Sequence, residues 1–367
     1  MKLKGIRLLL LSTAIALLVA CGGSAEPVGS PTPYPTYTPV SSATPNLEAT
    51  VQDQVLGSAP TATVTPSAPT PTQVQSMSTD TQQSRAVSAT DSTKGLPDHL
   101  TENLRFTITQ MVDGRNIERP VLVEIPSDFD PNKIYPLLFL FHGNGGDIEA
   151  LASHNQGETS AEGICKGNCI GVIPQGHFNS WNLAAEGIDD ELESNADDIG
   201  FVAEVIGGLS KYPQVDSLRV FGVGYSNGAG MVQVLAAESE LFQGIAAFAT
   251  NLIKGREPKN KDHKVLVLQF HGMEDKVIPY EGGKSIVGHT FIGAEESAQI
   301  WAGHNECNPK PKVQIYSNGN KKIEYSDCGN GKKVFHMGVE NGNHDVAGPN
   351  KEYLGITWDL FESLLIP

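Results

Sequence analysis

The stretch Gly-Tyr-Ser-Asn-Gly at residues 224–228 directly follows an apolar run at residues 218–223 and leads into a segment with helical spacing. A serine on a sharp turn between a strand and a helix needs small residues two positions before and after it, because larger side chains would collide there. Gly224 and Gly228 meet that need. The stretch therefore predicts a strand–turn–helix nucleophile elbow, with Ser226 as the attacking group.

Similar apolar runs, rich in β-branched and aromatic residues, alternate with helical patterns along residues 95–367. An antiparallel pair is expected at 105–111 and 121–125, and buried strands at 137–141, 170–173, 218–223, 245–249, 265–270 and 334–339. Helices are expected at 198–209, 228–238, 295–301 and 356–365. Near-continuous apolar strands separated by helices are typical of a mostly parallel sheet covered on both faces. We therefore predict a single α/β domain over residues 95–367.

The first residues have the features of an export signal. Three basic residues precede an apolar run at 8–20, which ends in Leu-Val-Ala-Cys at 18–21. This order predicts a lipoprotein signal peptide over residues 1–20, cleaved before Cys21, whose acylated thiol would anchor the protein to a membrane. An ordinary cleaved signal followed by a chance cysteine is the alternative. Either way, we expect an exported protein, and the first interpretation places it at the cell surface.

Residues 21–94 differ in composition from the rest of the chain. Ten of the 23 prolines lie at residues 22–94, among Ser, Thr, Ala and Gln. Such a segment buries little surface and cannot form continuous backbone ladders, so we expect a disordered tether.

The charge balance excludes one class of partner. The chain of 367 residues has a formal net charge of −16. An acidic surface repels phosphate backbones, so nucleic-acid binding is not expected.

A glycine-rich stretch, His-Gly-Asn-Gly-Gly at residues 142–146, follows the expected strand 137–141. Glycines in such a loop let backbone N–H groups point at a developing oxyanion. We expect the oxyanion donors to be Asn144 and Gly145 together with Asn227, the residue after the nucleophile. A phosphate-binding loop would need Gly-Lys-Ser/Thr, which is absent from this stretch, and no cofactor is expected.

A serine hydrolase of this kind carries its acid and its histidine downstream of the serine, in that order. Asp275 follows the expected strand 265–270, and Glu274 is its rival. His344 follows the last expected strand, whereas His336 lies inside that strand and is more consistent with a structural role. We expect Ser226 to attack, His344 to take and return the proton, and Asp275 to hold the imidazole.

Several further segments, taken in order, extend the pattern beyond the elbow. They are Tyr-Pro-Leu-Leu-Phe-Leu-Phe-His-Gly at 135–143, Ser-Trp-Asn at 180–182, and the stretches at 197–201, 215–220, 271–283 and 301–307. Through them, residues 95–367 resemble the esterases of the polyhydroxybutyrate depolymerase and feruloyl esterase group, in the α/β-hydrolase superfamily. The resemblance implies the same catalytic triad. One departure is that Gly-Asn-His-Asp-Val-Ala-Gly stands at 342–348, where the group usually has Gly-Gly-His-Thr-Trp-Pro-Gly.

Candidates for contact with the substrate are Trp181, His142 and Tyr225. Trp181 lies in the Ser-Trp-Asn match and could stack on an aromatic acyl group or a sugar, or could simply pack in the core. The stretch at 186–198 is rich in acids, which would suit either a calcium site or a solvated loop before a helix. The resemblance suggests that Asp197 or Asp198 also braces the elbow region.

Four cysteines remain after Cys21, and in an exported protein we expect them to be oxidised. Four cysteines allow three pairings. The resemblance implies a bond between Cys307 and Cys328, which would leave Cys165 and Cys169 to close a small loop. Zinc binding by the latter two is the alternative, but their spacing is a weak ligand set, and no metal is expected.

The segment at 251–264 is too short for the helical lid that lipases insert at the corresponding place. We therefore expect an open cleft, which suits polymer-borne esters: hydroxyalkanoate polyesters, feruloyl or acetyl groups on plant polysaccharide, or related synthetic polyesters. The expected function is a lipid-anchored carboxylic ester hydrolase acting on such a substrate. A non-catalytic surface binding protein and a serine peptidase, both on the same fold, are the alternatives.

Overall fold

A computed structural model describes residues 93–154, 159–185, 194–345 and 350–365 of the chain. The expected signal peptide, Cys21 and nearly all of the expected tether lie outside the described residues. No helix in the described part combines the length and the apolar character needed to cross a membrane.

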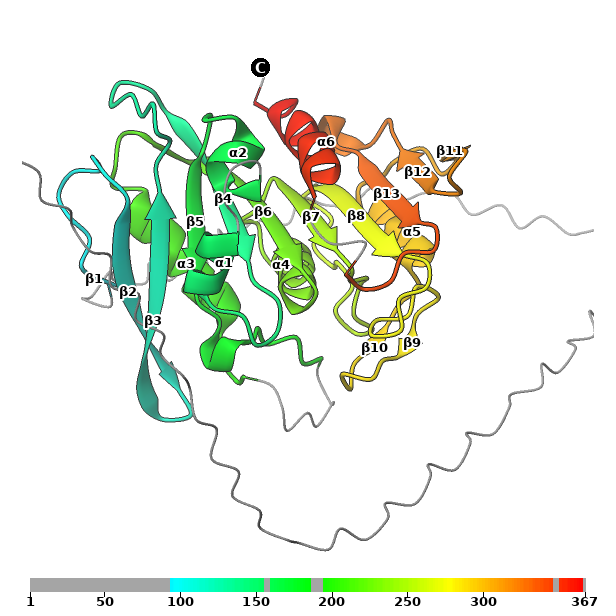
Figure 1. Cartoon of the computed structure of the whole chain (residues 1–367), viewed down its shortest axis with the longest axis horizontal. Helices are drawn as coiled ribbons and strands as arrows, with labels where there is room; N and C mark the ends of the chain where they lie inside the picture. The colour runs from blue at the N-terminus through cyan, green and yellow to red at the C-terminus, as the bar shows by residue number, and fades with distance from the viewer. Residues whose placement is uncertain (1–92, 155–158, 186–193, 346–349, 366–367) are drawn as a thin grey trace, which may run out of the picture. The chain divides into compact units, whose positions relative to one another are not determined.

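Eleven strands of the described chain form one sheet, in the order β1-β2-β3-β5-β4-β6-β7-β8-β13-β12-β11 (Figure 1). Strands β4 to β8 and β13 pair in parallel, and β2 and β3 add an antiparallel pair at one side. The expected mostly parallel sheet is confirmed, and the crossing of β4 and β5 is that of an α/β-hydrolase. The strands are β1 (Thr93–Lys94), β2 (Leu104–Val112), β3 (Arg115–Glu124), β4 (Tyr135–Phe141), β5 (Ile170–Pro174), β6 (Val215–Tyr225), β7 (Gly244–Phe248), β8 (Leu266–Gly272), β11 (Lys312–Ile315), β12 (Lys321–Tyr325) and β13 (Val334–Val339).

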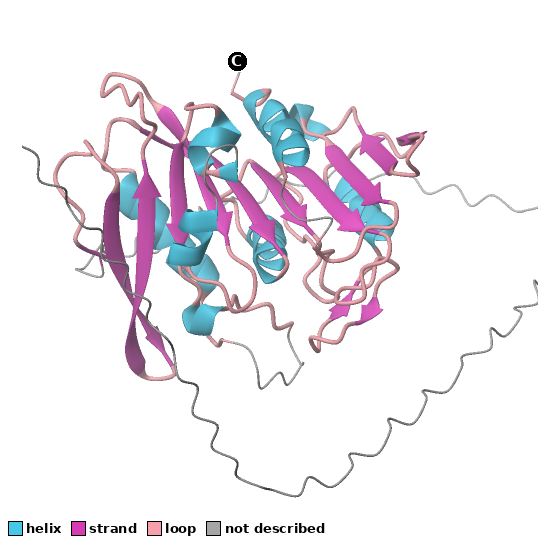
Figure 2. Ribbon diagram, viewed as in Figure 1, coloured by secondary structure: helices cyan, strands magenta, loops and turns pink. Residues whose placement is uncertain are grey.

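Helices cover both faces of this sheet (Figure 2), and each face has its own hydrophobic cluster. Residues of α3, α4 and α5 belong to one cluster, and residues of α1, α2 and α6 belong to the other. The central strand β4 shows why: Phe139 and Phe141 face the first cluster, while Leu138 and Leu140 face the second. The helices are α1 (Ile148–His154), α2 (Ala161–Cys165), α3 (Asp198–Leu209), α4 (Asn227–Glu238), α5 (Ala294–His304) and α6 (Lys351–Glu362).

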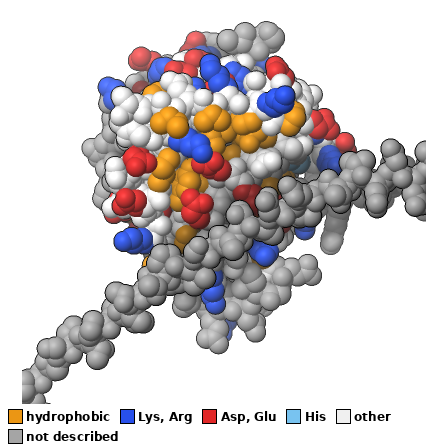
Figure 3. Space-filling model, turned by 90° about the vertical axis from the view of Figure 1, so that its right-hand side faces the viewer, with side chains coloured by type: hydrophobic (Ala, Val, Ile, Leu, Met, Phe, Trp, Pro, Cys, Tyr) orange, Lys and Arg blue, Asp and Glu red, His pale blue; other side chains and the backbone are white. Residues whose placement is uncertain are grey.

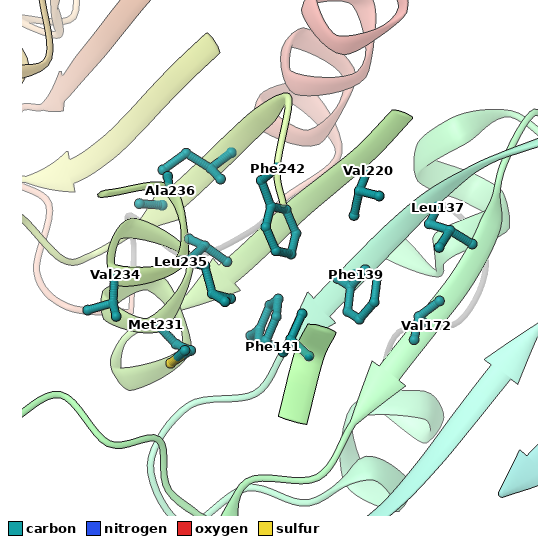
Figure 4. Packing of buried hydrophobic residues seen from close by; sticks show 14 of the residues in the cluster. Leu137, Phe139, Phe141, Val172, Val220, Met231, Val234, Leu235, Ala236 and Phe242 are labelled. Carbon is teal, nitrogen blue, oxygen red and sulfur yellow. The ribbon is translucent and has the colours of Figure 1, made fainter. Parts of the chain in front are cut away.

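Aromatic packing fills the space between β4 and α4 (Figure 4). The ring of Phe242 meets that of Phe139 edge-on, with centroids 5.6 Å apart, and also lies against Phe141. All three rings are buried. Met231 and Leu235 belong to the same buried cluster and come from α4, the helix that begins immediately after the predicted nucleophile.

Three features differ from expectation. The last helix, expected at 356–365, begins at Lys351, because the side chain of Asn350 caps it by accepting from the N–H of Tyr353. The helices α1 and α2 span only seven and five residues, too few to show a helical period. The hairpin of β11 and β12 was also not expected: β11 is exposed along its length, so no burial pattern marks it. Figure 3 looks onto the side of the molecule that carries this edge.

The described residues contain two disulfides, as expected for an exported protein. Cys165 is bonded to Cys169, between the end of α2 and the start of β5. Cys307 is bonded to Cys328, which joins the segment after α5 to the segment before β13.

A buried ion pair joins β3 to the start of α3. The guanidinium of Arg119 lies 2.6 Å from Asp198 Oδ1, and both side chains are at most 2% exposed. Arg119 also stacks on the ring of Phe201 and donates to the carbonyl oxygen of Gln175. The other carboxylate oxygen of Asp198 accepts the N–H of Asn182 at 2.6 Å. This pair therefore connects the sheet and α3 to the segment that contains Trp181.

We expect the substitution Asp198→Ala to reduce the free energy of unfolding by about 3–5 kcal/mol, because it leaves the buried Arg119 without its counter-charge. Urea denaturation followed by circular dichroism measures this. Asp359→Ala is the control, since its partner Lys166 is exposed and surface pairs contribute little. Equal losses in the two variants would contradict the assigned role of the buried pair.

Candidate active site

The elbow is built as the glycine spacing predicts. Strand β6 ends at Tyr225 and α4 begins at Asn227, so Ser226 alone makes the turn, with a φ of 54° and a ψ of −120°. That conformation is strained for a residue with a side chain. A Cβ atom on Gly224 would lie 2.2 Å from the carbonyl oxygen of Gly228. Only glycine at position 224 lets the strand and the helix approach this closely.

Three side chains from distant parts of the sequence meet at this turn. Ser226 Oγ lies 2.9 Å from His344 Nε2, and His344 Nδ1 lies 2.8 Å from Asp275 Oδ2. Each residue follows a different strand of the parallel sheet: β6, β8 or β13. The carboxyl ends of parallel strands share one edge of the sheet, which explains how these residues come together.

The carboxylate of Asp275 is buried and fully engaged. Its Oδ1 accepts the N–H groups of Val277 and Ile278 at 2.8 and 2.9 Å. Burial alone would raise the pKa of Asp275, but hydrogen bonds from His271 and His344 outweigh it and hold that pKa well below its usual range. The rival Glu274 is exposed. Asp275 therefore lies where a triad acid belongs, and Glu274 does not.

The prediction that the N–H of Gly145 is an oxyanion donor is wrong. It has a left-handed φ of 76°, and its N–H donates to the carbonyl oxygen of Asn179 at 2.8 Å. Asn144 and Asn227 both line the cavity at Ser226. The N–H of Asn227 also belongs to the first turn of α4, where backbone N–H groups carry the positive end of the helix dipole.

Trp181 is fully buried, so the expectation that it could stack on a substrate is wrong and the core alternative holds. Its ring packs edge-on against Phe141, and its Nε1 donates to the carbonyl oxygen of His142 at 2.9 Å. Its backbone N–H donates to Asn227 Oδ1 at 2.7 Å. Trp181 thus positions Asn227 and the glycine-rich loop, because it is bonded to both.

His142 also positions a loop, which corrects its expected contact with substrate, whereas contact between the half-buried Tyr225 and the substrate stays a prediction. His142 is buried, its Nδ1 donates to the carbonyl oxygen of Gly143, and its Nε2 accepts the N–H of Gly176. Burial lowers the pKa of His142, which favours this neutral form. The hydroxyl of Tyr225 donates to Asp345 Oδ1 at 3.2 Å, beside His344. Both side chains are committed to neighbouring protein atoms.

A cavity of about 250 Å³ opens beside Ser226. Most of its lining was not anticipated from the sequence. The apolar residues are Leu183, Ile278, Ile286, Val287 and Phe291, and His289 and Ser180 are polar residues of the lining. Several of these residues come from a short hairpin, β9 (Gly283–Lys284) and β10 (Thr290–Phe291), and from the turn between its strands. Ile286 and Val287, in that turn, are both exposed apolar residues, and no sequence motif marks them.

The acid-rich stretch is only partly described, because residues 186–193 lie outside the described ranges. Of its last two acids, Asp197 caps α3 by accepting the N–H of Gly200, and Asp198 forms the buried pair with Arg119. Within the described residues, no three His, Cys, Asp or Glu side chains gather in a way that could hold a metal ion.

Comparison with known proteins identifies relatives among feruloyl esterases. The chain is 27% identical over 234 residues to a probable feruloyl esterase C of Aspergillus niger, covering 62% of this chain and 77% of the relative. It is 28% identical over 262 residues to feruloyl esterase B of Piromyces equi, covering 68% of this chain but only 46% of the relative. No family model matches.

Among solved structures, a thermostable esterase aligns with a TM-score of 0.48 and 18% identity, over 72% of this chain and 62% of the other. An acetyl xylan esterase from Aspergillus awamori aligns with a TM-score of 0.47 and 14% identity, over 70% and 99%. The sequence relatives confirm the expected resemblance to feruloyl esterase-type α/β-hydrolases.

We expect Gly224→Ala to reduce kcat by about 10²-fold or more, because the added Cβ must displace Gly228 and with it Ser226. Steady-state kinetics on a soluble ester measure this. Gly207→Ala is the matched control, since a Cβ at that helical position has no atom within 4 Å. Normal turnover by the Gly224 variant would contradict the packing described for the elbow.

The lowered pKa of Asp275 also predicts a pH-dependent stability. A carboxyl group whose pKa is lower in the folded than in the unfolded protein stabilises the fold above its unfolded pKa, and this contribution is lost as pH falls through the folded pKa. We expect Asp275→Asn to be destabilised at pH 7, and the difference from the wild type to shrink below about pH 4. Urea denaturation across pH measures it, with Glu274→Gln as control. A constant difference across this range would contradict the prediction.

Proposed function

We propose that this chain, a serine carboxylic ester hydrolase similar to feruloyl esterases, cleaves its substrates through an acyl-enzyme formed on Ser226. His344 would act as general base and acid, and Asp275 would orient it. The observation that carries the proposal is the continuous hydrogen-bonded series from Ser226 Oγ through His344 to Asp275, at 2.9 and 2.8 Å. These distances suit proton transfer and orientation of the base.

The reaction would proceed in two halves. The Ser226 hydroxyl passes its proton to His344 Nε2 while its oxygen attacks the ester carbonyl. The resulting oxyanion accepts hydrogen bonds from the backbone N–H groups of Asn144 and Asn227. His344 then returns the proton to the departing alcohol, which leaves an acyl group on the serine. Water, deprotonated by His344, releases the acid and restores the enzyme. Because protein groups supply every proton transfer, the scheme needs no cofactor.

The cavity supports a proposal for the acyl group. A space of about 250 Å³ that is lined by five apolar side chains and by a few uncharged polar groups suits an uncharged acyl group of aromatic or short aliphatic type. Two of the relatives are feruloyl esterases by name, and an aromatic acyl ester on a polysaccharide is therefore the substrate we favour. Polyhydroxybutyrate, other polyesters and acetylated xylan are the competing substrates.

We also propose that the protein works outside the cytoplasm, held to a membrane by lipid on Cys21. The two disulfides support an oxidising compartment. The lipid anchor rests on the sequence at residues 1–21 alone. An anchored enzyme with a long tether could reach esters on a polymer near the cell surface.

We expect Ser226→Ala to lower kcat by up to about 10⁶-fold on methyl ferulate and on a p-nitrophenyl ester of a short acid, because the attacking oxygen is removed. Ser210→Ala, which changes an exposed serine after α3, serves as the matched control and should keep full activity. Normal turnover by the Ser226 variant would refute the proposed mechanism.

A substrate panel with the wild type tests the proposed acyl group: methyl ferulate, acetylated xylan, polyhydroxybutyrate and tributyrin. We expect the highest kcat/KM on methyl ferulate. Activity confined to triglycerides and rising with acyl length would contradict both the aromatic acyl group and the open cleft.

A further inference from the structure

The turn at residues 285–289, between β9 and β10, brings two uncovered apolar side chains to the cavity beside Ser226. Ile286 is 78% exposed and Val287 is 41% exposed, and both line that cavity. The other large apolar side chains that are exposed in the described residues do not line it. Exposed apolar surface at a ligand cavity is typical of a binding surface, because its removal from water is favourable.

The turn is closed by hydrogen bonds that do not involve these two side chains. The N–H and the hydroxyl of Ser285 both donate to the carbonyl oxygen of His289, at 2.8 and 3.0 Å. Next to the turn, Phe291 is buried and pairs with Ile253 in an antiparallel bridge. The hairpin lies beyond the carboxyl ends of the parallel strands (Figure 1), the edge of the sheet at which the triad residues meet. The two exposed side chains can therefore be substituted without loss of the contacts that hold the turn.

The rest of the apolar wall has little surface left to bury. Leu183, Ile278 and Phe291 line the same cavity but are each at most 3% exposed. Apolar contact stabilises a complex roughly in proportion to the apolar area that leaves water. A bound ligand would therefore remove apolar area of the protein from water mainly at Ile286 and Val287.

The size of the acyl group decides whether it reaches the turn. The reacting carbonyl must lie at Ser226, and an acetyl group ends one carbon beyond that carbonyl. Acetyl therefore fills only a small part of a cavity of about 250 Å³, whereas a hydroxycinnamoyl group extends further through it. The described residues that line the cavity include no Asp, Glu, Lys or Arg, which suits an acyl group without charge.

We propose that Ile286 and Val287 determine the acyl specificity of the enzyme: they cover the far part of a bulky, uncharged acyl group and thereby favour its esters over acetyl esters. The proposal rests on the proposed function, since it places the acyl group on Ser226. The two residues act on the selection of substrate, because they lie outside the triad. Discrimination of this kind has a limited size, since one methylene group in an apolar pocket changes kcat/KM by about 10- to 200-fold.

Two esters that share an alcohol isolate the acyl side: p-nitrophenyl ferulate and p-nitrophenyl acetate. In the double variant Ile286→Thr/Val287→Thr, threonine keeps the branched shape at Cβ but replaces apolar surface by a hydroxyl. We expect kcat/KM on p-nitrophenyl ferulate to fall about 10-fold, and kcat/KM on p-nitrophenyl acetate to stay within about twofold of the wild type. Steady-state kinetics on both esters measure the ratio of the two values.

Ile315→Thr is the matched control, because Ile315 on β11 is 70% exposed and does not line the cavity. Ile286→Leu is the conservative variant, which keeps the apolar surface of the turn. Both should show the wild-type ratio of the two kcat/KM values. A double variant with the wild-type ratio would overturn the proposal, whether neither value falls or both fall equally.

A feruloylated arabinoxylan distinguishes the acyl group from the polysaccharide as the occupant of this surface. Activity of the double variant that is lost on the polymer but kept on p-nitrophenyl ferulate would assign the turn to the polysaccharide, and would overturn the proposal. Hydrolysis of p-nitrophenyl acetate that persists in Ser226→Ala would instead refute the proposed function. Acetyl is not expected to reach the turn, so the two failures can be told apart.

Discussion

The strained backbone at Ser226 is the constraint on which the rest of the site depends. The turn exists only because Gly224 lets β6 approach α4, and Gly228 lets α4 approach the end of β4 at Phe141, to distances that no side chain permits. Two hydrogen bonds stabilise the backbone of this turn. The N–H of Ser226 donates to the carbonyl oxygen of Phe248, and the hydroxyl of Thr250 donates to the carbonyl oxygen of Ser226. The serine hydroxyl is therefore presented to His344 by the backbone.

Buried polar contacts connect the turn at Ser226 to more distant parts of the fold. Asn227, the residue after the serine, is bonded to Trp181, which lies beside Asn182, and Asn182 donates to Asp198. The Arg119 pair then connects this segment to the outer strand β3. On the other side, Asp275 is held by backbone N–H groups and by His271. Both halves of the site are thus fixed by groups that cannot leave without exposing a buried charge or donor.

The sequence predicts the parallel sheet, the elbow and the three residues that meet there, because glycine spacing and chain order are local or sequential signals. It does not predict which groups face a cavity. Trp181 and His142 looked like substrate contacts from their place beside the motifs, but both are buried, because a residue after a strand can turn either inward or outward. Gly145 was misassigned because the direction of its N–H depends on a partner, Asn179, from another loop. The apolar hairpin around Ile286 carries no motif.

Serine-specific labelling tests the central claim most directly. The protein is treated with a fluorophosphonate and then digested for mass spectrometry. The account predicts one label per chain, on the peptide that contains Ser226, and a loss of esterase activity in proportion to the fraction of protein labelled. A fully inhibited enzyme labelled at another residue, or an active enzyme that takes no label, would contradict it.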